Sequence, residues 1–131
     1  MTEKQSNIRQ HIRLKADDLY KFMRNLMIAA GANIECAEAA AQIHLEADLR
    51  GVNLQGADYL PYTIKNLERG IIDGMAKPSV VKELGATALI DGNGGLGQLA
   101  ALKAVEIVSS KARKFGSATV SVCNSTDIFM I

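Results

Sequence analysis

The stretch EADLRGVNLQG, residues 46–56, carries the pattern that decides the fold of the first half of the chain. An Ala-rich segment with helical spacing runs into it and ends at Gly51, a residue type that favours the left-handed conformation beyond a helix C-terminus. Similar runs, each closed by a glycine, precede and follow it. The sequence therefore predicts three helices, over residues 17–30, 35–50 and 57–69, which end at Gly31, Gly51 and Gly70.

The second half of the chain changes to a pattern that is typical of strands, with short apolar segments between turn residues. Gly85 and Ala86 separate two such segments and predict a hairpin. A later segment is apolar on most sides over about twenty positions, so we expect a long, buried helix there. The remaining expected elements are a short edge strand at 12–14, hairpin strands at 80–84 and 87–90, a Gly-rich loop at 91–95, the long helix at 96–115 and a strand at 118–123.

These elements predict an α/β (mixed α+β) chain in two parts. Residues 1–74 are expected to form a helical N-terminal domain, and residues 75–131 the start of a cofactor-binding α/β domain. The boundary is placed near Gly74–Pro78, where the helical pattern stops. The chain closes on the apolar run IFMI, residues 128–131, which indicates either a fragment of a longer protein, the favoured interpretation, or a segment that docks on a partner.

Composition excludes several classes of function. The net charge is +1 and no Lys/Arg stripe follows one face, which argues against nucleic-acid binding. No apolar run approaches the roughly 20 residues that a membrane span requires. The polar stretch Met1–Gln10 has no secretion signal, and Cys36 and Cys123 have no CxxC partner, so we expect reduced thiols in a cytoplasmic protein.

The glycines of residues 92–97 formally match the dinucleotide fingerprint GxGxxG, between an expected strand and an expected helix. The acidic residue that would hold a ribose after the next strand is absent, because Cys123 and Asn124 stand there. We therefore interpret the glycines as a structural turn in preference to a phosphate cradle. An independent nucleotide-binding domain remains the third of three functional hypotheses.

His44 and Asp48 lie four residues apart on an expected helix, so their side chains share a face. The spacing suits a His–carboxylate pair that orients a general base, but a helix-surface or interface contact is the favoured interpretation. His11 lies in a polar tail and carries no signal. Arg50 complements the helix dipole at its position and could also bind a substrate carboxylate. Residues 124–127 suit a turn with side-chain caps.

Several motifs together resemble the malate/L-lactate dehydrogenase family of NAD(P)-dependent 2-hydroxyacid oxidoreductases. The matching stretches are ADLRG at 47–51, LPY at 60–62, GII at 70–72, DGNGGLGQ at 91–98, KARKFG at 111–116 and NS at 124–125. The resemblance implies a non-Rossmann fold, NAD or NADP as cofactor, a 2-hydroxy or 2-oxo acid as substrate, and a homodimer or larger homo-oligomer. No set of residues near His44 and Asp48 resembles a metal site, so no metal is expected.

The departures from the family pattern fall on the chemistry. Leu54 and Gln55 stand where the family has Ser-His, Tyr59 stands at a substrate-binding Arg position, and Asp127 stands at a second His position. Gln has no titratable proton, and Tyr lacks the fixed charge of a guanidinium. By resemblance, the site residues are Gln55 and Asp127 (catalytic positions), Arg50, Tyr59, Asn124 and Ser125 (substrate), and Gly94, Gly95, Gly97 and Gln98 (cofactor).

Two main hypotheses follow. In the first, the chain is an N-terminal portion of a malate/lactate dehydrogenase-like oxidoreductase, weak or inactive in this form. Asp127 is then the titratable group at a family catalytic position, and acid–base work there requires burial to raise its pKa. In the second, the chain is a non-catalytic dimerisation or interaction module that keeps the scaffold of the family.

Overall fold

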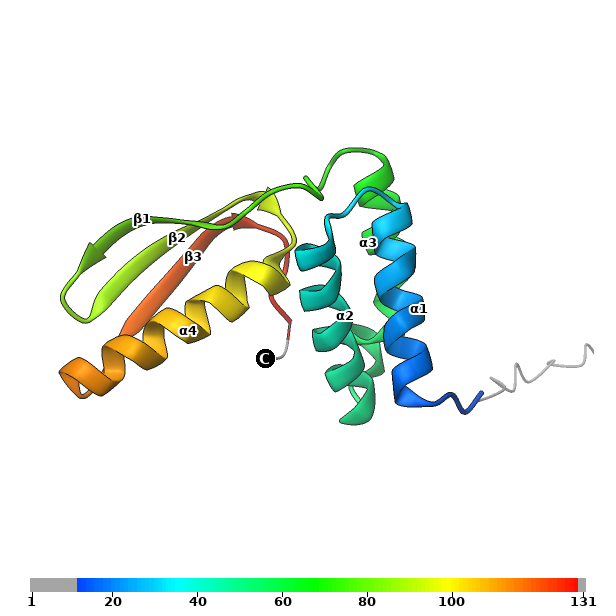
Figure 1. Cartoon of the computed structure of the whole chain (residues 1–131), viewed down its shortest axis with the longest axis horizontal. Coiled ribbons are helices and arrows are strands. Elements are labelled where there is room, and N and C mark those ends of the chain that lie inside the picture. The colour runs from blue at the N-terminus through cyan, green and yellow to red at the C-terminus, as the bar shows by residue number, and fades with distance from the viewer. Residues whose placement is uncertain (1–11, 130–131) are drawn as a thin grey trace, which may run out of the picture.

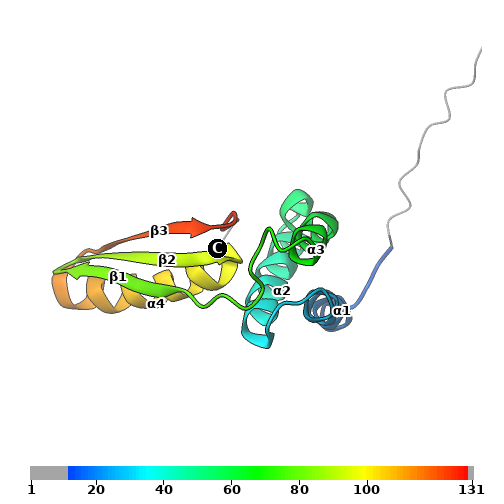
Figure 2. The same ribbon diagram turned by 90° about the horizontal axis from the view of Figure 1, so that it is seen from above.

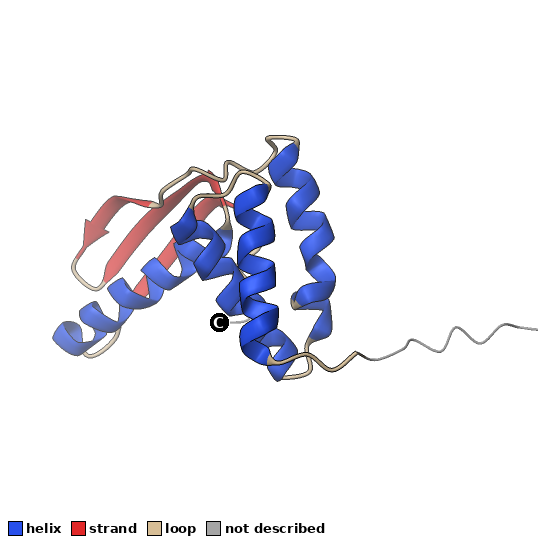
Figure 3. Ribbon diagram, turned by 45° about the vertical axis from the view of Figure 1, so that its right-hand side comes forward, coloured by secondary structure: helices blue, strands red, loops and turns tan. Residues whose placement is uncertain are grey.

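The computed structural model describes residues 12–129. The chain forms two adjoining parts, a group of helices and a sheet that is covered by one helix (Figures 1 and 3). The order of the elements confirms the predicted fold class. The elements are α1 (Ala16–Ala29), α2 (Ile34–Leu49), the 3₁₀ turns η1 (Asn53–Gln55) and η2 (Ala57–Tyr59), α3 (Leu60–Glu68), β1 (Ser79–Leu84), β2 (Thr87–Gly95), α4 (Gly97–Phe115) and β3 (Thr119–Ser125).

Helix α2 is the centre of the helical part, because its small side chains let neighbouring elements approach on several sides. Its Ala-rich middle is almost entirely buried, and Asn33 caps its start by accepting a hydrogen bond from the backbone N–H of Cys36 at 2.9 Å. Helix α1 buries Met23 and Met27 against it. Gly31, with φ of 103°, makes the turn between the two helices.

The sheet has the order β1-β2-β3, with β1 antiparallel to β2 and β2 parallel to β3. Helix α4 connects the two parallel strands and lies along one face of the sheet (Figure 2). In the described part of the chain, no helix covers the opposite face. In β2, Ala88, Ile90 and Gly92 are buried and alternate with more exposed residues. This alternation is the pattern of a strand with one covered face.

Two expectations about the bounds of these elements were wrong. Residues 91–95 are the end of β2 and not a loop, because Asp91 pairs with Ser79 and Gly95 pairs with Ser125 on the neighbouring strands. Residues 12–14 form no strand.

Helix α4 is also less buried than predicted, because a three-stranded sheet covers only one of its sides. The fully buried residues lie within its first two turns: Gly97, Gln98, Ala100 and Ala101. Within residues 12–129, no helix combines the length and the apolarity that crossing a bilayer demands. Residues 1–11 and 130–131 lie outside the described part of the chain. They include the polar stretch Met1–Gln10, His11 and the last two residues of the apolar run at 128–131.

Candidate functional site

Two of the predicted site residues, 68 positions apart in the sequence, meet where the helical part adjoins the end of β3. The hydroxyl of Tyr59, on η2, donates a hydrogen bond to Oδ2 of Asp127 at 3.3 Å. Phe129 packs its ring edge-on against Tyr59, with 4.6 Å between the ring centroids. The segment that leaves β3 runs toward the helical part (Figure 1), and its hydrogen bond brings positions 59 and 127 together.

Gly97 allows this path because the departing chain passes over the start of α4. Its N–H donates to Oγ1 of Thr126 at 2.9 Å, and the Thr126 N–H donates to the Gly95 carbonyl at 3.1 Å. A Cβ at position 97 would lie 2.7 Å from the Asp127 carbonyl oxygen and closer still to that of Thr126. The glycine is therefore required by packing against its own chain.

The loop that carries Gln55 is held by two side chains of α2. Nδ1 of His44 lies 2.6 Å from the Gln55 carbonyl oxygen, and Oδ2 of Asp48 accepts the Ala57 N–H at 2.8 Å. Between them, Gly56 packs against the Asp48 carboxylate so closely that a Cβ would overlap it. His44 and Asp48 thus share a face, as their spacing predicts, but each bonds to the loop rather than to the other.

His44 is the residue whose importance the sequence analysis underestimated. It is completely buried, and not a helix-surface contact. Burial lowers its pKa below the ordinary value, against the smaller opposing effects of the bond to Gln55 and the charge of Asp48. A signal was present in the sequence: Ala37, Ala40 and Ala41 lie one and two turns before His44 on the same face, a pattern that indicates burial.

Tyr59 has a raised pKa, caused first by burial and then by the nearby Asp127 carboxylate and the Tyr62 hydroxyl. It therefore stays protonated at neutral pH and can donate a hydrogen bond or a proton. Gln55 is half-buried at the end of η1 and can only hydrogen-bond. The pair of Tyr59 and Asp127 thus offers one donor and one negative charge.

The other residues predicted to bind substrate form their hydrogen bonds with other groups. Arg50 is exposed at the end of α2, where its guanidinium pairs with Glu46 at 3.1 Å. Asn124 adopts φ of 50° and donates through Nδ2 to Oδ1 of Asp91 at 2.9 Å. Ser125, the last residue of β3, donates to the carbonyl of the next residue, Thr126, at 3.0 Å. Asn124 and Ser125 are the last two residues of β3, so the turn predicted for residues 124–127 is wrong at its first two positions.

The predicted cofactor residues divide into packed and open ones. A Cβ at Gly95 would lie 2.7 Å from that of Ala76, so this glycine, like Gly97, is closed off by the chain. Gly94, with φ of 73°, has open space on its Cβ side. Gln98 is buried, and its Oε1 has no hydrogen-bond partner among the described residues. Gly94 and Gln98 are therefore the positions where a bound group could still make contacts.

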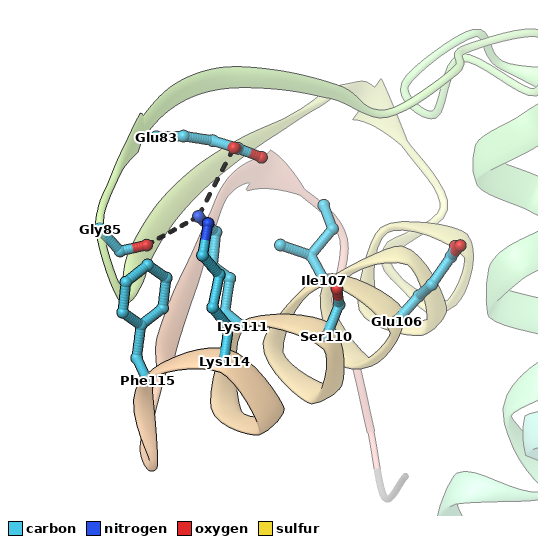
Figure 4. Close-up of a pocket in the computed structure, with 8 residues that line it drawn as sticks. All are labelled: Glu83, Gly85, Glu106, Ile107, Ser110, Lys111, Lys114 and Phe115. Atoms are coloured by element: carbon cyan, nitrogen blue, oxygen red, sulfur yellow. Dashed lines mark hydrogen bonds and ion pairs between the residues drawn. The ribbon is translucent and has the colours of Figure 1, made fainter.

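An open pocket of about 520 Å³ lies elsewhere, between the far end of α4 and the β1–β2 hairpin (Figure 4). Lys111 crosses it to reach the Gly85 carbonyl at 3.0 Å and the Glu83 carboxylate at 3.5 Å. None of the predicted site residues lines it. Over residues 12–129, no group of three or more His, Cys, Asp or Glu side chains could hold a metal ion.

Comparison with known proteins identifies the family. The profile described as malate/L-lactate dehydrogenase matches residues 14–131. A malate dehydrogenase of Pyrococcus abyssi is 31% identical over 115 residues, 88% of this chain and 32% of the relative. An L-sulfolactate dehydrogenase of Methanocaldococcus jannaschii is 34% identical over 112 residues, 86% of this chain and 33% of the relative.

Solved structures agree with the sequence relatives. Malate dehydrogenase from Entamoeba histolytica superposes with a TM-score of 0.86 at 30% identity, covering 91% of this chain and 33% of that one. Malate dehydrogenase from Pyrococcus horikoshii superposes with a TM-score of 0.86 at 30% identity, and the match covers 98% of this chain and 37% of that one. The chain belongs to the malate/L-lactate dehydrogenase family, and it spans about a third of the length of these relatives.

Proposed function

We propose that this chain forms part of an NAD(P)-dependent oxidoreductase site for 2-hydroxy and 2-oxo acids and that it has little activity by itself. The supporting observation is the contact between Tyr59 and Asp127, which joins two positions that the family pattern assigns to substrate binding and catalysis. The named relatives are malate and sulfolactate dehydrogenases, which supports the substrate class.

The side chains at these positions explain why we expect little activity. The bound nicotinamide would supply the hydride. Reduction of an oxoacid also needs a proton at the developing alkoxide; Gln55 cannot donate one, and Tyr59, with its raised pKa, is a weak acid. Asp127 places a negative charge beside Tyr59, and this charge repels the carboxylate of the substrate.

The cofactor residues support binding at two of four positions. Gly94 has open space and Gln98 has a buried acceptor without a partner among the described residues, so both fit a ligand that carries amide or hydroxyl donors. Gly95 and Gly97 are filled by the chain itself. A nucleotide-binding domain built on residues 92–97 alone is disfavoured, because Thr126 already takes the Gly97 N–H. Fluorescence titration with NADH tests binding directly.

The test of the proposed function is a steady-state assay of the purified chain with NADH and NADPH against pyruvate-type and oxaloacetate-type acids. We expect turnover close to the uncatalysed rate. A variant that restores the family residues, Leu54→Ser with Gln55→His, Tyr59→Arg and Asp127→His, should bind a 2-oxoacid more tightly than the parent chain. Leu84→Ser, an exposed change on β1, is the matched control. Efficient turnover by the parent chain that disappears in Asp127→Ala would overturn the proposal of low activity.

The second candidate is a non-catalytic dimerisation or interaction module, and the exposed apolar surface near α2 favours it. Ile12, Leu14 and Leu49 line an open groove of about 950 Å³, and their exposed fractions are 80%, 63% and 63%. Exposed apolar clusters of this kind mark interaction sites. Light scattering across a concentration series tests it: we expect a homodimer that Leu49→Asp dissociates. A strictly monomeric, folded chain at high concentration argues against this candidate.

A further inference from the structure

His44 lies at the centre of the contacts that assemble the candidate site. Its ring is 0% exposed and lies between the Gln55 carbonyl and the rings of Tyr59 and Phe129. The ring centroids are 6.3 Å from Tyr59 and 5.5 Å from Phe129. One side chain of α2 therefore contacts the loop, η2 and the segment after β3 together.

The hydrogen bond to Gln55 fixes the tautomer of the ring. A carbonyl oxygen can only accept, so Nδ1 must carry the proton in this 2.6 Å contact. In the neutral ring, Nε2 is then a bare acceptor, and it has no partner among the described residues. A proton added to Nε2 would create a charged donor in a buried place where these residues offer no acceptor.

The charges around the ring offset this cost only in part. Among the described residues, the titratable groups near it are Asp48 on the same helix, Tyr59 on η2, and Asp127, which is bonded to Tyr59. The Asp48 carboxylate already accepts the Ala57 N–H, and Asp127 already accepts the Tyr59 hydroxyl. A protonated His44 must therefore leave its position to reach water or a carboxylate.

Phe129 contacts the His44 ring from an unusual backbone conformation. Its backbone has φ of 65°, a left-handed conformation that is strained for a bulky residue. Its ring contacts with His44 and Tyr59 hold it there. Movement of His44 removes one of these two contacts.

We infer that His44 is a positioning residue of this site: the neutral ring holds Gln55, Tyr59 and Phe129 together, and protonation of Nε2 separates the Phe129 ring from Tyr59 and breaks the Tyr59–Asp127 contact. The inference deepens the proposed function, because it names the group that sets the arrangement of the site. It concerns the geometry of the chain itself, so its test requires no turnover. A failed activity assay bears on the proposed function alone.

The experiment follows both histidine rings by long-range ¹H–¹⁵N NMR on the whole chain. At pH 7.5, we expect His44 as the neutral Nδ1–H tautomer. From pH 7.5 to 5, the Tyr59–Phe129 ring NOE should disappear with the midpoint of the His44 titration, while the amide signals of the sheet, such as that of Ile90, persist. The ring signals of His11, the other histidine, are assigned separately so that the two rings are not confused.

Three variants isolate the cause. His44→Asn keeps a donor toward the Gln55 carbonyl but does not titrate, so its Tyr59–Phe129 contact should be independent of pH. His11→Asn and Asp127→Asn should leave the wild-type transition of the two rings in place. The inference is overturned by an Nε2–H tautomer, by ring contacts that survive protonation of His44, by the same transition in His44→Asn, or by loss of the sheet signals in the same step.

Discussion

Replacing Gly56 with Ala tests whether the loop of the candidate site is held by the Asp48 carboxylate. A Cβ at this position would lie 2.6 Å from Oδ2 of Asp48 and nearer still to its Cγ and Oδ1, so the carboxylate must move away. The Ala57 N–H then loses its 2.8 Å charged acceptor. A hydrogen bond to a charged group contributes about 1.5–3 kcal/mol, so we expect the free energy of unfolding to fall by about 2 kcal/mol. For a chain of this size, this corresponds to a Tm lower by about 8 °C.

Urea denaturation followed by circular dichroism measures this loss in a double-mutant cycle with Asp48→Ala. The single Asp48→Ala variant removes the same hydrogen bond and should also cost about 2 kcal/mol. In its background the clash at Gly56 is gone, so the double variant should cost about 2 kcal/mol rather than about 4. Simple addition of the two single effects would refute the reasoning, because the two residues would then act independently.

Three further predictions concern the surroundings of this loop. The neutral form of buried His44 belongs to the folded state, because burial lowers its pKa. Its contribution to the free energy of unfolding is therefore complete above the ordinary pKa of about 6.5. This contribution is lost as the pH falls through the lowered pKa of the folded state. Urea titrations from pH 7 to 5 should show a loss of at most about 1.4 kcal/mol per pH unit that is absent in His44→Asn. Tyr59→Phe removes a long, partly exposed bond to Asp127 and should cost only about 0.5 kcal/mol in the same assay; a loss above about 2 kcal/mol would contradict this picture. With a thiol reagent, exposed Cys123 should react about 100-fold faster than Cys36, because burial protects Cys36 and raises its pKa. Denaturant should make the two reaction rates equal. Equal rates in the native protein would contradict the packing of α2.

The helices could be predicted from the sequence because their signals are local. Helical spacing and the terminal glycines Gly31, Gly51 and Gly70 depend on neighbours within one or two turns, and all three adopt positive φ in the structure. The hairpin at Gly85 was predicted for the same reason. Local signals therefore account for most of the element order.

The features that the sequence analysis got wrong depend on contacts between distant residues. The end of β2 was interpreted as a loop because glycines disfavour strands, yet Gly92 and Gly95 lie in the strand where side chains of Ser125 and Ala76 leave room only for hydrogen. The burial of α4 depends on how many strands cover it, which periodicity along one helix does not reveal. The contact of Tyr59 with Asp127 was not predicted: the family resemblance assigned both positions to the site, but no local pattern links residues 68 positions apart.

Two glycines of the family motifs are required by packing within the chain itself. Gly56 is required by the Asp48 carboxylate, and Gly97 by the backbone of Thr126 and Asp127. Both contacts are internal to the chain and involve no substrate, so packing alone would preserve these motif positions after a change in chemistry. The motifs therefore establish the scaffold, and the chemistry depends on the side chains at positions 55, 59 and 127. Because two of these three already meet in the folded chain, restoring the family residues there tests the chemistry without rebuilding the fold.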